Sequence, residues 1–403
     1  MKFELQKYQN ILLKNLVETK RYLYDEISSS AKIIGIVGLR WVGKTTILLQ
    51  KLKENPKNSI YFSMDNPKVF SVGLFNMVED LYFNYWIKNF FVDEIHKYKN
   101  WNLELKNIYD NFPDLKLMFS WSSSLDIIKW SYDLSRRVLI YKLNTLSFRE
   151  YLEIKYKKKI KKISLNDIFE NNLELEKKLL DLLDFPILEE FKNYLNFWEF
   201  PFFLEWWEKD YILKLENVIN KIIYEDIASF YNLKTENLVY FKEILYFILN
   251  SEPWLFSANS LSKNLKISND SVNNYVKILE EIWLLNSINF YGNISQTIRK
   301  AKKIYISINN INSILSFASQ ENMWRIRESF FVNNFLNIWK EIFYTKQWDF
   351  IFKNGQKEII VEIWWKNKTR RQIKKLQNAY LVQDWISSVK ENKIPLWFFG
   401  FLY

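Results

Sequence analysis

The chain has 403 residues, of which 48% are hydrophobic and 26% charged, so it can bury a sizeable core and form about two to four domains. It has no cysteine and one histidine, which excludes a disulfide framework and a thiolate metal site and disfavours a zinc enzyme, and no apolar run approaches the ~18 residues of a membrane span. The net charge of +11 suits a partner that carries phosphates, although a solvated lysine-rich surface would give the same balance.

Apolar segments alternate with helical segments through the first 150 residues. Residues 1–30 have a helical spacing of apolar residues at Leu12, Leu16 and Leu23, and a second helix is predicted from Thr45 to Glu54. The segments that we expect to be buried strands are Lys32 to Gly38, Ser59 to Asp65, Ile87 to Glu94 and Leu115 to Ser120. This alternation predicts an α/β fold, with a mostly parallel sheet and helices on both of its faces.

The rest of the chain changes pattern twice. Four domains are predicted: an α/β domain at 1–150, a helical lid or linker at 151–250, a domain of two helices and short strands at 251–310 and a small α/β domain at 311–403. The basic run from Lys155 to Lys162 is either a solvated helix end or a binding segment. The charged first residues do not resemble a secretory signal, so we expect a cytoplasmic protein.

The segment from Gly38 to Thr45, GLRWVGKT, matches the pattern G-x-x-x-x-G-K-[ST] between a predicted strand and a predicted helix. Such a turn directs backbone N–H groups at phosphates, its lysine reaches the β- and γ-phosphates, and its hydroxyl binds Mg²⁺ at the start of the helix. We therefore expect ATP and Mg²⁺ as cofactors. The residues predicted to bind the nucleotide are Gly38, Arg40, Trp41, Val42, Gly43, Lys44, Thr45 and Thr46.

An acidic pair, Asp93 and Glu94, follows the predicted strand FFV. At the carboxyl end of a parallel strand Asp93 suits Mg²⁺ coordination, together with Thr45, and Glu94 suits activation of the attacking water. The alternative is a degenerate loop that binds nucleotide without hydrolysing it, and Glu94 argues against that alternative.

The segments GKTT, VDEIHKYKNW, LMFSWSSSLDI and DLSRRV followed by LSFREYLE resemble a prokaryotic family of AAA-type ATP-binding proteins with a C-terminal domain of unknown function. The resemblance implies that Ser122 is a sensor residue at a strand end. It also implies that Arg136 or Arg137 stabilises the charge of the transferred phosphate; action on a neighbouring subunit is one alternative, and it would require an oligomer. We interpret His96, the single histidine, as a residue that supports the site and not as a ligand.

Glycine is scarce, at 7 residues, and tryptophan abundant, at 17, whereas about 28 glycines would be expected at the average ~7%. Trp101 and Trp397 fit their contexts, but many other tryptophans stand where a turn glycine is expected: Trp41, Trp86, Trp121, Trp130, Trp198, Trp254, Trp283, Trp324, Trp348, Trp364 and Trp365. We hypothesise that most of these are glycines in the natural host, encoded by a reassigned UGA codon. The alternative is a chain that is genuinely rich in tryptophan.

The segment from Ser260 to Ile288 resembles a helix-turn-helix followed by a wing. Leu261, Leu265, Ile267, Val272, Tyr275, Val276 and Leu279 are predicted to face inward, and Ser268 or Asn269 to cap the second helix. Ser271, Asn273, Asn274 and Lys277 would then face outward, as polar groups suited to a groove of double-stranded DNA. The alternative is a winged helix that only contacts protein, because Glu280 and Glu281 would repel phosphate.

The last segment resembles a restriction-endonuclease-like fold. Its candidate site residues are Glu328, Asp349, Glu362 and Lys366, in which two carboxylates would hold Mg²⁺ and the lysine would stabilise charge at the attacked phosphate. The spacing is E-x-x-x-K and not E-x-K, so retention of the fold for binding without cutting is the alternative. The basic stretch from Lys366 to Lys375 could hold a phosphate backbone or form a solvated helix.

The function that these patterns favour is an ATPase that couples nucleotide state to a C-terminal module that binds DNA or protein. A regulatory protein that binds nucleotide without hydrolysis and an ATP-regulated nuclease are the alternatives.

Overall fold

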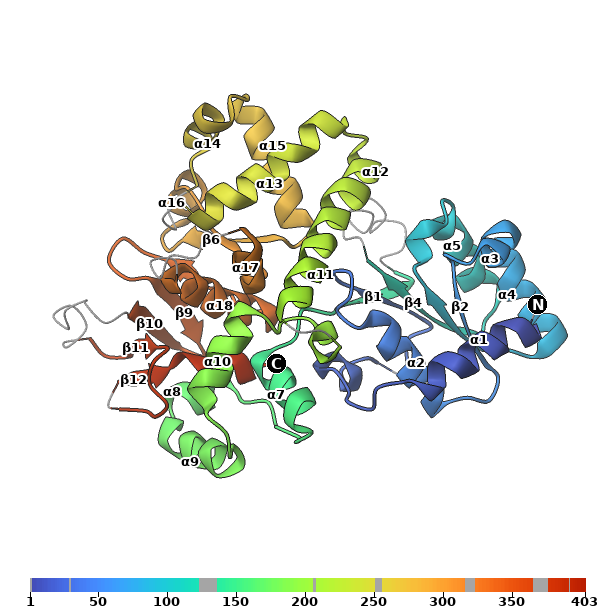
Figure 1. Ribbon diagram of the computed structural model, residues 1–403, viewed down its shortest axis with the longest axis horizontal. Coiled ribbons are helices and arrows are strands. Elements are labelled where there is room, and N and C mark those ends of the chain that lie inside the picture. The colour runs from blue at the N-terminus through green and yellow to red at the C-terminus, as the bar shows by residue number, and fades with distance from the viewer. Residues whose placement is uncertain are drawn as a thin grey trace. The chain divides into compact units, whose positions relative to one another are not determined.

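The structure is a computed structural model. It describes residues 2–28, 30–122, 136–205, 208–250, 256–315, 323–364, 376–390 and 392–403. The chain divides into two compact units, Met1–Thr145 and Leu146–Tyr403 (Figure 1). The first boundary predicted from the sequence, at residue 150, lies close to this division. The boundaries predicted at 250 and 310 fall inside the second unit and stay predictions.

The first unit is built on a five-stranded sheet in the order β2-β3-β4-β1-β5. Its strands are β1 (Ile33–Val37), β2 (Ser59–Ser63), β3 (Asn89–Asp93), β4 (Lys116–Trp121) and β5 (Val138–Lys142). All four pairs of neighbours are parallel, so the carboxyl ends of the strands meet at one edge. Strands β1 to β4 are apolar and largely buried because helices cover both faces of the sheet, as the sequence predicts, whereas the edge strand β5 exposes Leu139 and Ile140.

Helices lie on both sides of this sheet (Figure 1). Helices α1 (Lys2–Lys14) and α2 (Lys44–Glu54) contact each other and β2, whereas α3 (Pro67–Val72), α4 (Leu74–Tyr85) and α5 (Trp101–Asn111) form a second group. Short 3₁₀ turns, η1 (Tyr22–Asp25) and η2 (Ile95–Lys97), complete the described part of the unit. The predicted α/β fold is confirmed.

One expectation for this unit is wrong, and one strand was missed. The helix predicted over residues 1–30 ends at Lys14, and Leu12 on its predicted apolar side is 39% exposed. The segment after α1 is held in a non-helical path because the Gln50 side chain donates hydrogen bonds to the carbonyls of Val17 and Thr19. Strand β5 was not predicted, although its sequence VLIYK is short and rich in apolar residues.

The second unit begins with helices. These are α7 (Phe148–Tyr156), α8 (Leu165–Phe169), α9 (Asn172–Leu182), α10 (Ile187–Asn196), η3 (Pro201–Leu204), α11 (Glu208–Lys221), the π-helical turn η4 (Ile222–Ile227), α12 (Ala228–Tyr231) and α13 (Thr235–Asn250). A capping box, in which Ser147 and Glu150 bond each other's backbone N–H groups, starts α7. Across the described residues no helix is long and apolar enough to cross a membrane.

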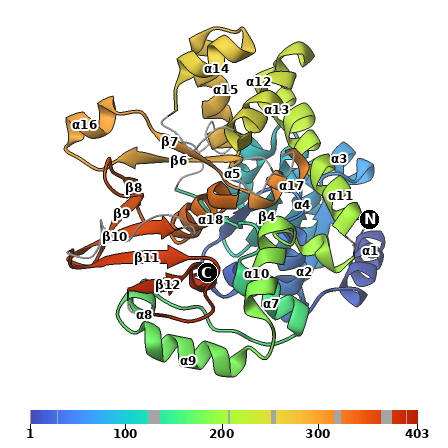
Figure 2. The ribbon, with the colours of Figure 1, turned by 60° about the vertical axis from the view of Figure 1, so that its left-hand side comes forward.

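Helices α14 (Ala258–Leu265) and α15 (Asn269–Glu281) form the expected helix-turn-helix (Figure 2). Ser268 caps α15 by accepting a hydrogen bond from the N–H of Ser271. Val272, Tyr275, Val276 and Leu279 are buried, whereas Asn273, Asn274 and Lys277 are exposed, so the predicted inner and outer faces of α15 are confirmed. Strands β6 (Leu285–Phe290) and β7 (Lys303–Ile306) pair in antiparallel fashion, and the segment of chain that connects them contains α16 (Ile294–Arg299).

The seven-stranded sheet of this unit has the order β12-β11-β10-β9-β8-β6-β7, so the β6–β7 hairpin continues into the C-terminal strands. The remaining elements are η5 (Asn309–Ile311), α17 (Asn312–Leu315), α18 (Met323–Asn337), β8 (Phe343–Tyr344), β9 (Phe350–Asn354), β10 (Lys357–Trp364), β11 (Ala379–Gln383), β12 (Lys393–Pro395) and η8 (Leu396–Phe401). Phe148 and Phe191 from the helices share one core with Phe331 and Phe399. Helices α7 to α10 therefore pack as part of this α/β unit.

Tryptophan occupies the left-handed backbone region at four described positions: Trp41, Trp86, Trp283 and Trp339. The last three end α4, α15 and α18, where the next N–H turns back to a carbonyl of the final helical turn. This helix end normally carries glycine, because a Cβ in left-handed backbone costs about 1–2 kcal/mol. By contrast Trp121, Trp198, Trp348 and Trp364 are not left-handed, and Trp324 lies within helix α18. Trp130, Trp254 and Trp365 lie outside the described residues.

Candidate functional site

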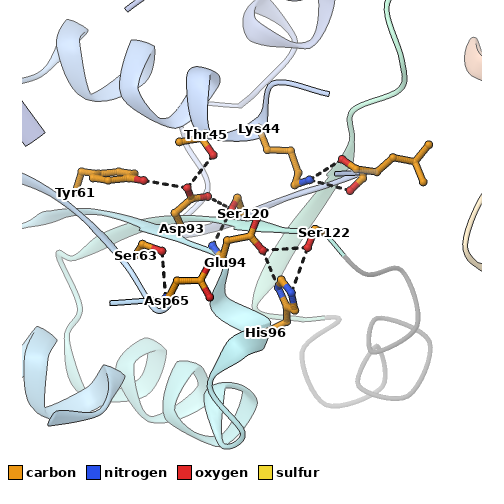
Figure 3. A network of polar contacts seen from close by, with 12 residues as sticks. Lys44, Thr45, Tyr61, Ser63, Asp65, Asp93, Glu94, His96, Ser120 and Ser122 are labelled. Carbon is orange, nitrogen blue, oxygen red and sulfur yellow. Dashed lines mark hydrogen bonds and ion pairs between the residues drawn. The ribbon is translucent and has the colours of Figure 1, made fainter. Parts of the chain in front are cut away.

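The phosphate-loop motif lies where the sequence predicts it, between buried strand β1 and helix α2. Gly38 has φ 156° and Gly43 has φ 102°, and a Cβ at Gly38 would collide with the carbonyl oxygen of Leu143. The Nζ of Lys44, a buried side chain, donates hydrogen bonds to the carbonyls of Gly38 at 2.9 Å and Leu39 at 2.7 Å (Figure 3). The lysine is thus folded into the concave side of its own loop.

The other loop residues differ in environment. Val42 is fully buried, Trp41 is 49% exposed with φ 69°, and Arg40 and Thr46 are partly exposed. Trp41, a non-glycine residue with left-handed backbone, is therefore a strained position within the phosphate loop, directly before the buried Val42.

Asp93 at the end of β3 is the centre of a hydroxyl cluster (Figure 3). Its Oδ2 accepts hydrogen bonds from Thr45 Oγ1 at 2.8 Å and Tyr61 OH at 2.9 Å, and its Oδ1 accepts one from Ser120 Oγ. Burial raises the pKa of Asp93, and the bonds from Ser120, Thr45 and Tyr61 oppose that rise. A carboxylate next to a hydroxyl at the start of α2 provides the oxygen ligands that Mg²⁺ prefers.

Glu94 lies in the left-handed region, with φ 51°, directly after Asp93. Its Oε2 accepts a hydrogen bond from Ser122 Oγ at 3.0 Å and lies 3.4 Å from His96 Nδ1. Ser122 Oγ is also 3.2 Å from His96 Nε2, so the three side chains form a closed triangle at the strand ends (Figure 3). The backbone N–H of Glu94 donates to Ser120 Oγ at 3.0 Å, which connects this triangle to the Asp93 cluster.

The two candidate arginines, Arg136 and Arg137, lie directly before strand β5, away from the Asp93 cluster. Arg136 is exposed, and Arg137 forms an ion pair with Asp110, with Nε 3.2 Å from Oδ1. Both precede β5, whereas the phosphate loop follows β1, and β1 and β5 are parallel. The arginines therefore lie at the amino ends of the strands, and the phosphate loop of the same chain lies at the carboxyl ends. A strand of five residues separates these two ends by about 16 Å.

Sequence reasoning missed Tyr61 and Ser120. Both are inner positions of β2 and β4, and a serine or tyrosine within an apolar strand gives no signal of the carboxylate that it will meet. Only the strand order, which places β3 between β2 and β4, could have found them.

The structure brings two of the nuclease-like candidates together. Asp349 and Glu362 lie beside each other because β9 pairs with β10: Glu362 Oε1 accepts from the N–H of Asp349 at 3.2 Å, and Asp349 Oδ2 accepts from the N–H of Ile363 at 3.0 Å. Glu328, on α18, is buried and accepts a hydrogen bond from Tyr305 OH at 3.0 Å. Lys366 lies outside the described residues.

The charges of Glu328 and Asp349 both act on the buried hydroxyl of Tyr305, and together with its burial they raise its pKa. Among the residues that the structure describes, no group of three or more histidine, cysteine, aspartate or glutamate side chains is arranged to hold a metal ion.

A known protein family matches most of the first unit. Residues 30–152 match the family model of an AAA domain, so this part of the chain is an AAA-type P-loop ATPase domain that binds nucleotide. Residues 188–307 match the model of a domain of unknown function.

The chain is similar to two uncharacterized proteins of Methanocaldococcus jannaschii. It is 32% identical to MJ1637 over 315 residues, which are 73% of this chain and 66% of that protein, and 24% identical to MJ1544 over 399 residues, which are 92% of this chain and 85% of that protein. The chain thus spans slightly less than two thirds of MJ1637.

Among solved structures, the RuvB Holliday junction branch migration motor of Thermotoga maritima is 13% identical, with a TM-score of 0.24 over 71% of this chain and 89% of that one. AMPPCP-bound DnaA from Aquifex aeolicus is 16% identical, with a TM-score of 0.27 over 69% and 88%.

The single histidine allows a direct test of the Glu94 triangle. Burial, with the charges of Lys97, Lys44 and Arg40, lowers the pKa of His96 from 6.5 to about 3. Between about pH 6.5 and pH 3 the histidine is protonated in the unfolded chain but stays neutral in the folded chain. The free energy of unfolding should therefore decrease by at most about 1.4 kcal/mol for each pH unit as the pH is lowered through this range.

We expect the imidazole resonances to show no titration between pH 5 and 8, and His96→Gln to remove this part of the acid destabilisation. A midpoint near pH 6.5 in the imidazole shifts would contradict the buried, neutral histidine.

Proposed function

We propose that this protein binds ATP with Mg²⁺ and hydrolyses it, and that nucleotide state controls the second unit. The contact between Thr45 Oγ1 and Asp93 Oδ2, at 2.8 Å beside the Lys44 loop, is the observation that carries the proposal. It joins the first turn of α2 to the carboxyl end of β3, where phosphate and metal ligands must meet. The AAA domain match over residues 30–152 supports it.

Each residue has a distinct role in this mechanism. The backbone N–H groups of the loop and the Lys44 ammonium would hold the β- and γ-phosphates, for which Lys44 exchanges its bonds to the carbonyls of Gly38 and Leu39. Thr45 and Asp93 would hold Mg²⁺, which neutralises charge on the phosphates. Glu94 would accept a proton from the attacking water, and Ser122 would orient that carboxylate.

Arg136 or Arg137 would act on the nucleotide of a neighbouring subunit, because neither can reach the loop of its own chain. This role requires an oligomer, and in it Arg137 would exchange Asp110 for phosphate oxygens.

The ATPase proposal predicts different defects for two variants. Lys44→Ala should weaken ATP binding by about 100-fold, since it removes a charged donor from the loop. Glu94→Gln should retain ATP binding but lower turnover by about 100-fold or more, since an amide cannot accept the proton of water. Fluorescent-nucleotide titration and phosphate release measure the two effects.

Lys53→Ala and Glu79→Gln, two exposed positions of the same unit, are the matched controls and should behave as the unsubstituted protein. Turnover that survives both Lys44→Ala and Glu94→Gln would overturn the proposal.

The second unit would bind double-stranded DNA through α15 and the α16 segment. The outer face of α15 presents Asn273, Asn274 and Lys277, and the segment from Tyr291 to Lys303 contains four basic residues and no acidic one. Glu281, which would repel phosphate, is bound by Tyr231 OH and lies 3.6 Å from the Lys277 ammonium. A protein-only interface is the alternative.

The DNA proposal predicts steep salt dependence. Replacing Arg299 and Lys300 by alanine should weaken duplex binding at low salt and flatten the plot of log affinity against log salt by about 2, because each phosphate contact contributes about 0.9 to the slope. Lys177→Ala with Lys192→Ala, two exposed lysines of helices α9 and α10, is the charge-matched control. Duplex affinity that does not change with salt would favour the protein-only interface.

A nuclease is a second candidate function, supported by the adjacent carboxylates of Asp349 and Glu362. It requires Mg²⁺-dependent cutting of DNA that Asp349→Ala abolishes, and DNA that stays uncut under every metal condition removes it.

We further propose that the left-handed tryptophans are glycines in the natural host, through a reassigned UGA codon. Trp86 and Trp339 are 74% and 82% exposed, so glycine there would lose little packing and should stabilise the fold by about 1 kcal/mol. Trp397→Gly is the control and should destabilise it by about 3–5 kcal/mol, because Trp397 is fully buried. Urea unfolding measures both.

Peptide masses of the protein from its natural host test the codon directly. Glycine masses at residues 41, 86, 283 and 339 would support the proposal, and tryptophan masses there would overturn it.

A further inference from the structure

Arg21, which the phosphate-loop motif does not include, is buried against the loop, with an exposed fraction of 6%. Its guanidinium donates to the carbonyl of Val42, the residue before Gly43, and to the carbonyls of Asn144 at 2.9 Å and Thr145 at 3.1 Å. One planar group of fixed geometry therefore holds the phosphate loop and the last residues of the first unit at the same time.

The following residue, Tyr22, reinforces this connection. Its hydroxyl donates to the carbonyl of Lys142 at 2.9 Å and accepts from the backbone N–H of Asn144 at 3.2 Å and from its side-chain amide at 3.1 Å. Arg21 and Tyr22 thus bind every described residue from 142 to 145 except Leu143.

Leu143 contacts the loop directly. Its N–H donates to the carbonyl of Val37 at 2.7 Å, and its own carbonyl oxygen lies where a Cβ of Gly38 would be. The segment from Lys142 to Thr145, which we name the exit segment, therefore contacts the start of the phosphate loop directly and is connected to Val42 through Arg21. Thr145 is followed by Leu146, the first residue of the second unit.

The geometry points to Arg21 as a positioning residue that fixes the phosphate loop and transmits its nucleotide state to the exit segment, with Tyr22 holding that segment in register. This inference rests on the proposed ATP binding for its nucleotide-dependent part, whereas the hydrogen bonds of Arg21 and Tyr22, which we name the clamp, do not depend on that proposal. When phosphates bind, a shift of the Val42 carbonyl would move the guanidinium, and the carbonyls of Asn144 and Thr145 would follow it only while the Tyr22 hydroxyl holds the exit segment in register.

Two substitutions separate the functions of the clamp. Arg21→Lys retains the charge but cannot span three carbonyls from one plane, so it should weaken ATP binding by about tenfold, the loss expected when hydrogen bonds from a charged group are removed. Tyr22→Phe removes only the hydroxyl on the exit segment, so ATP affinity should be unchanged while coupling is lost. Tyr82→Phe, which removes a hydroxyl bonded to exposed Asp114, is the matched control.

The experiment is hydrogen–deuterium exchange of the full chain at peptides covering residues 37–46 and 140–147, with and without ATP and Mg²⁺, beside nucleotide titration. In the unsubstituted chain ATP should slow exchange at both peptides. Without nucleotide, Arg21→Lys should speed exchange at both, and Tyr22→Phe only at 140–147. With ATP, Tyr22→Phe should retain protection at 37–46 and lose it at 140–147.

The outcomes distinguish the two claims. Faster exchange at both peptides in Arg21→Lys, in a chain that never responds to ATP, would keep the clamp and overturn the proposed function. Unchanged exchange and unchanged ATP affinity in Arg21→Lys, in a chain that binds ATP, would overturn the clamp. Tyr22→Phe settles the coupling by itself: ATP protection retained at 140–147 would overturn transmission through the exit segment.

Discussion

The buried carboxylate of Asp93 connects neighbouring elements at the carboxyl ends of the strands of the first sheet. Asp93 accepts hydrogen bonds from Thr45 on α2, Tyr61 on β2 and Ser120 on β4, so three other elements converge on the last residue of β3. A buried carboxylate is costly unless such donors replace its lost hydration. The carboxylate that we propose as a ligand of Mg²⁺ is therefore also a structural junction, so both roles constrain the same side chain.

The strand order makes this junction possible. In the order β2-β3-β4-β1-β5, the strands that carry Asp93, Ser120 and the loop are consecutive neighbours, and β5 runs on the far side of β1. Because every pair is parallel, the loop after β1, the acidic pair after β3 and the hydroxyls of β4 meet at one edge. The same rule places the residues after β5 beside the loop, where Gly38 leaves room for the Leu143 carbonyl.

Local patterns predicted much of this arrangement. The loop, the acidic pair and four of the five strands of the first sheet follow from apolar runs and glycine spacing, as do the buried face and the cap of α15. The contacts that could not be predicted join residues far apart in sequence, such as Arg21 to Asn144 and Tyr61 to Asp93, because no local spacing encodes a partner more than 30 residues away. The expectation of a turn at Trp121 also failed, since that side chain is buried in β4 against Trp101.

We propose that the Lys44 loop and the Thr45–Asp93 pair form a nucleotide site in which metal and phosphate are held together. Calorimetric titration of the full chain with ATP, in the presence and absence of Mg²⁺, measures this directly. We expect saturable binding of one nucleotide per chain that Mg²⁺ tightens, since Thr45 and Asp93 contribute only when the ion is bound. Absence of saturable binding, or binding equally tight without Mg²⁺, would contradict it.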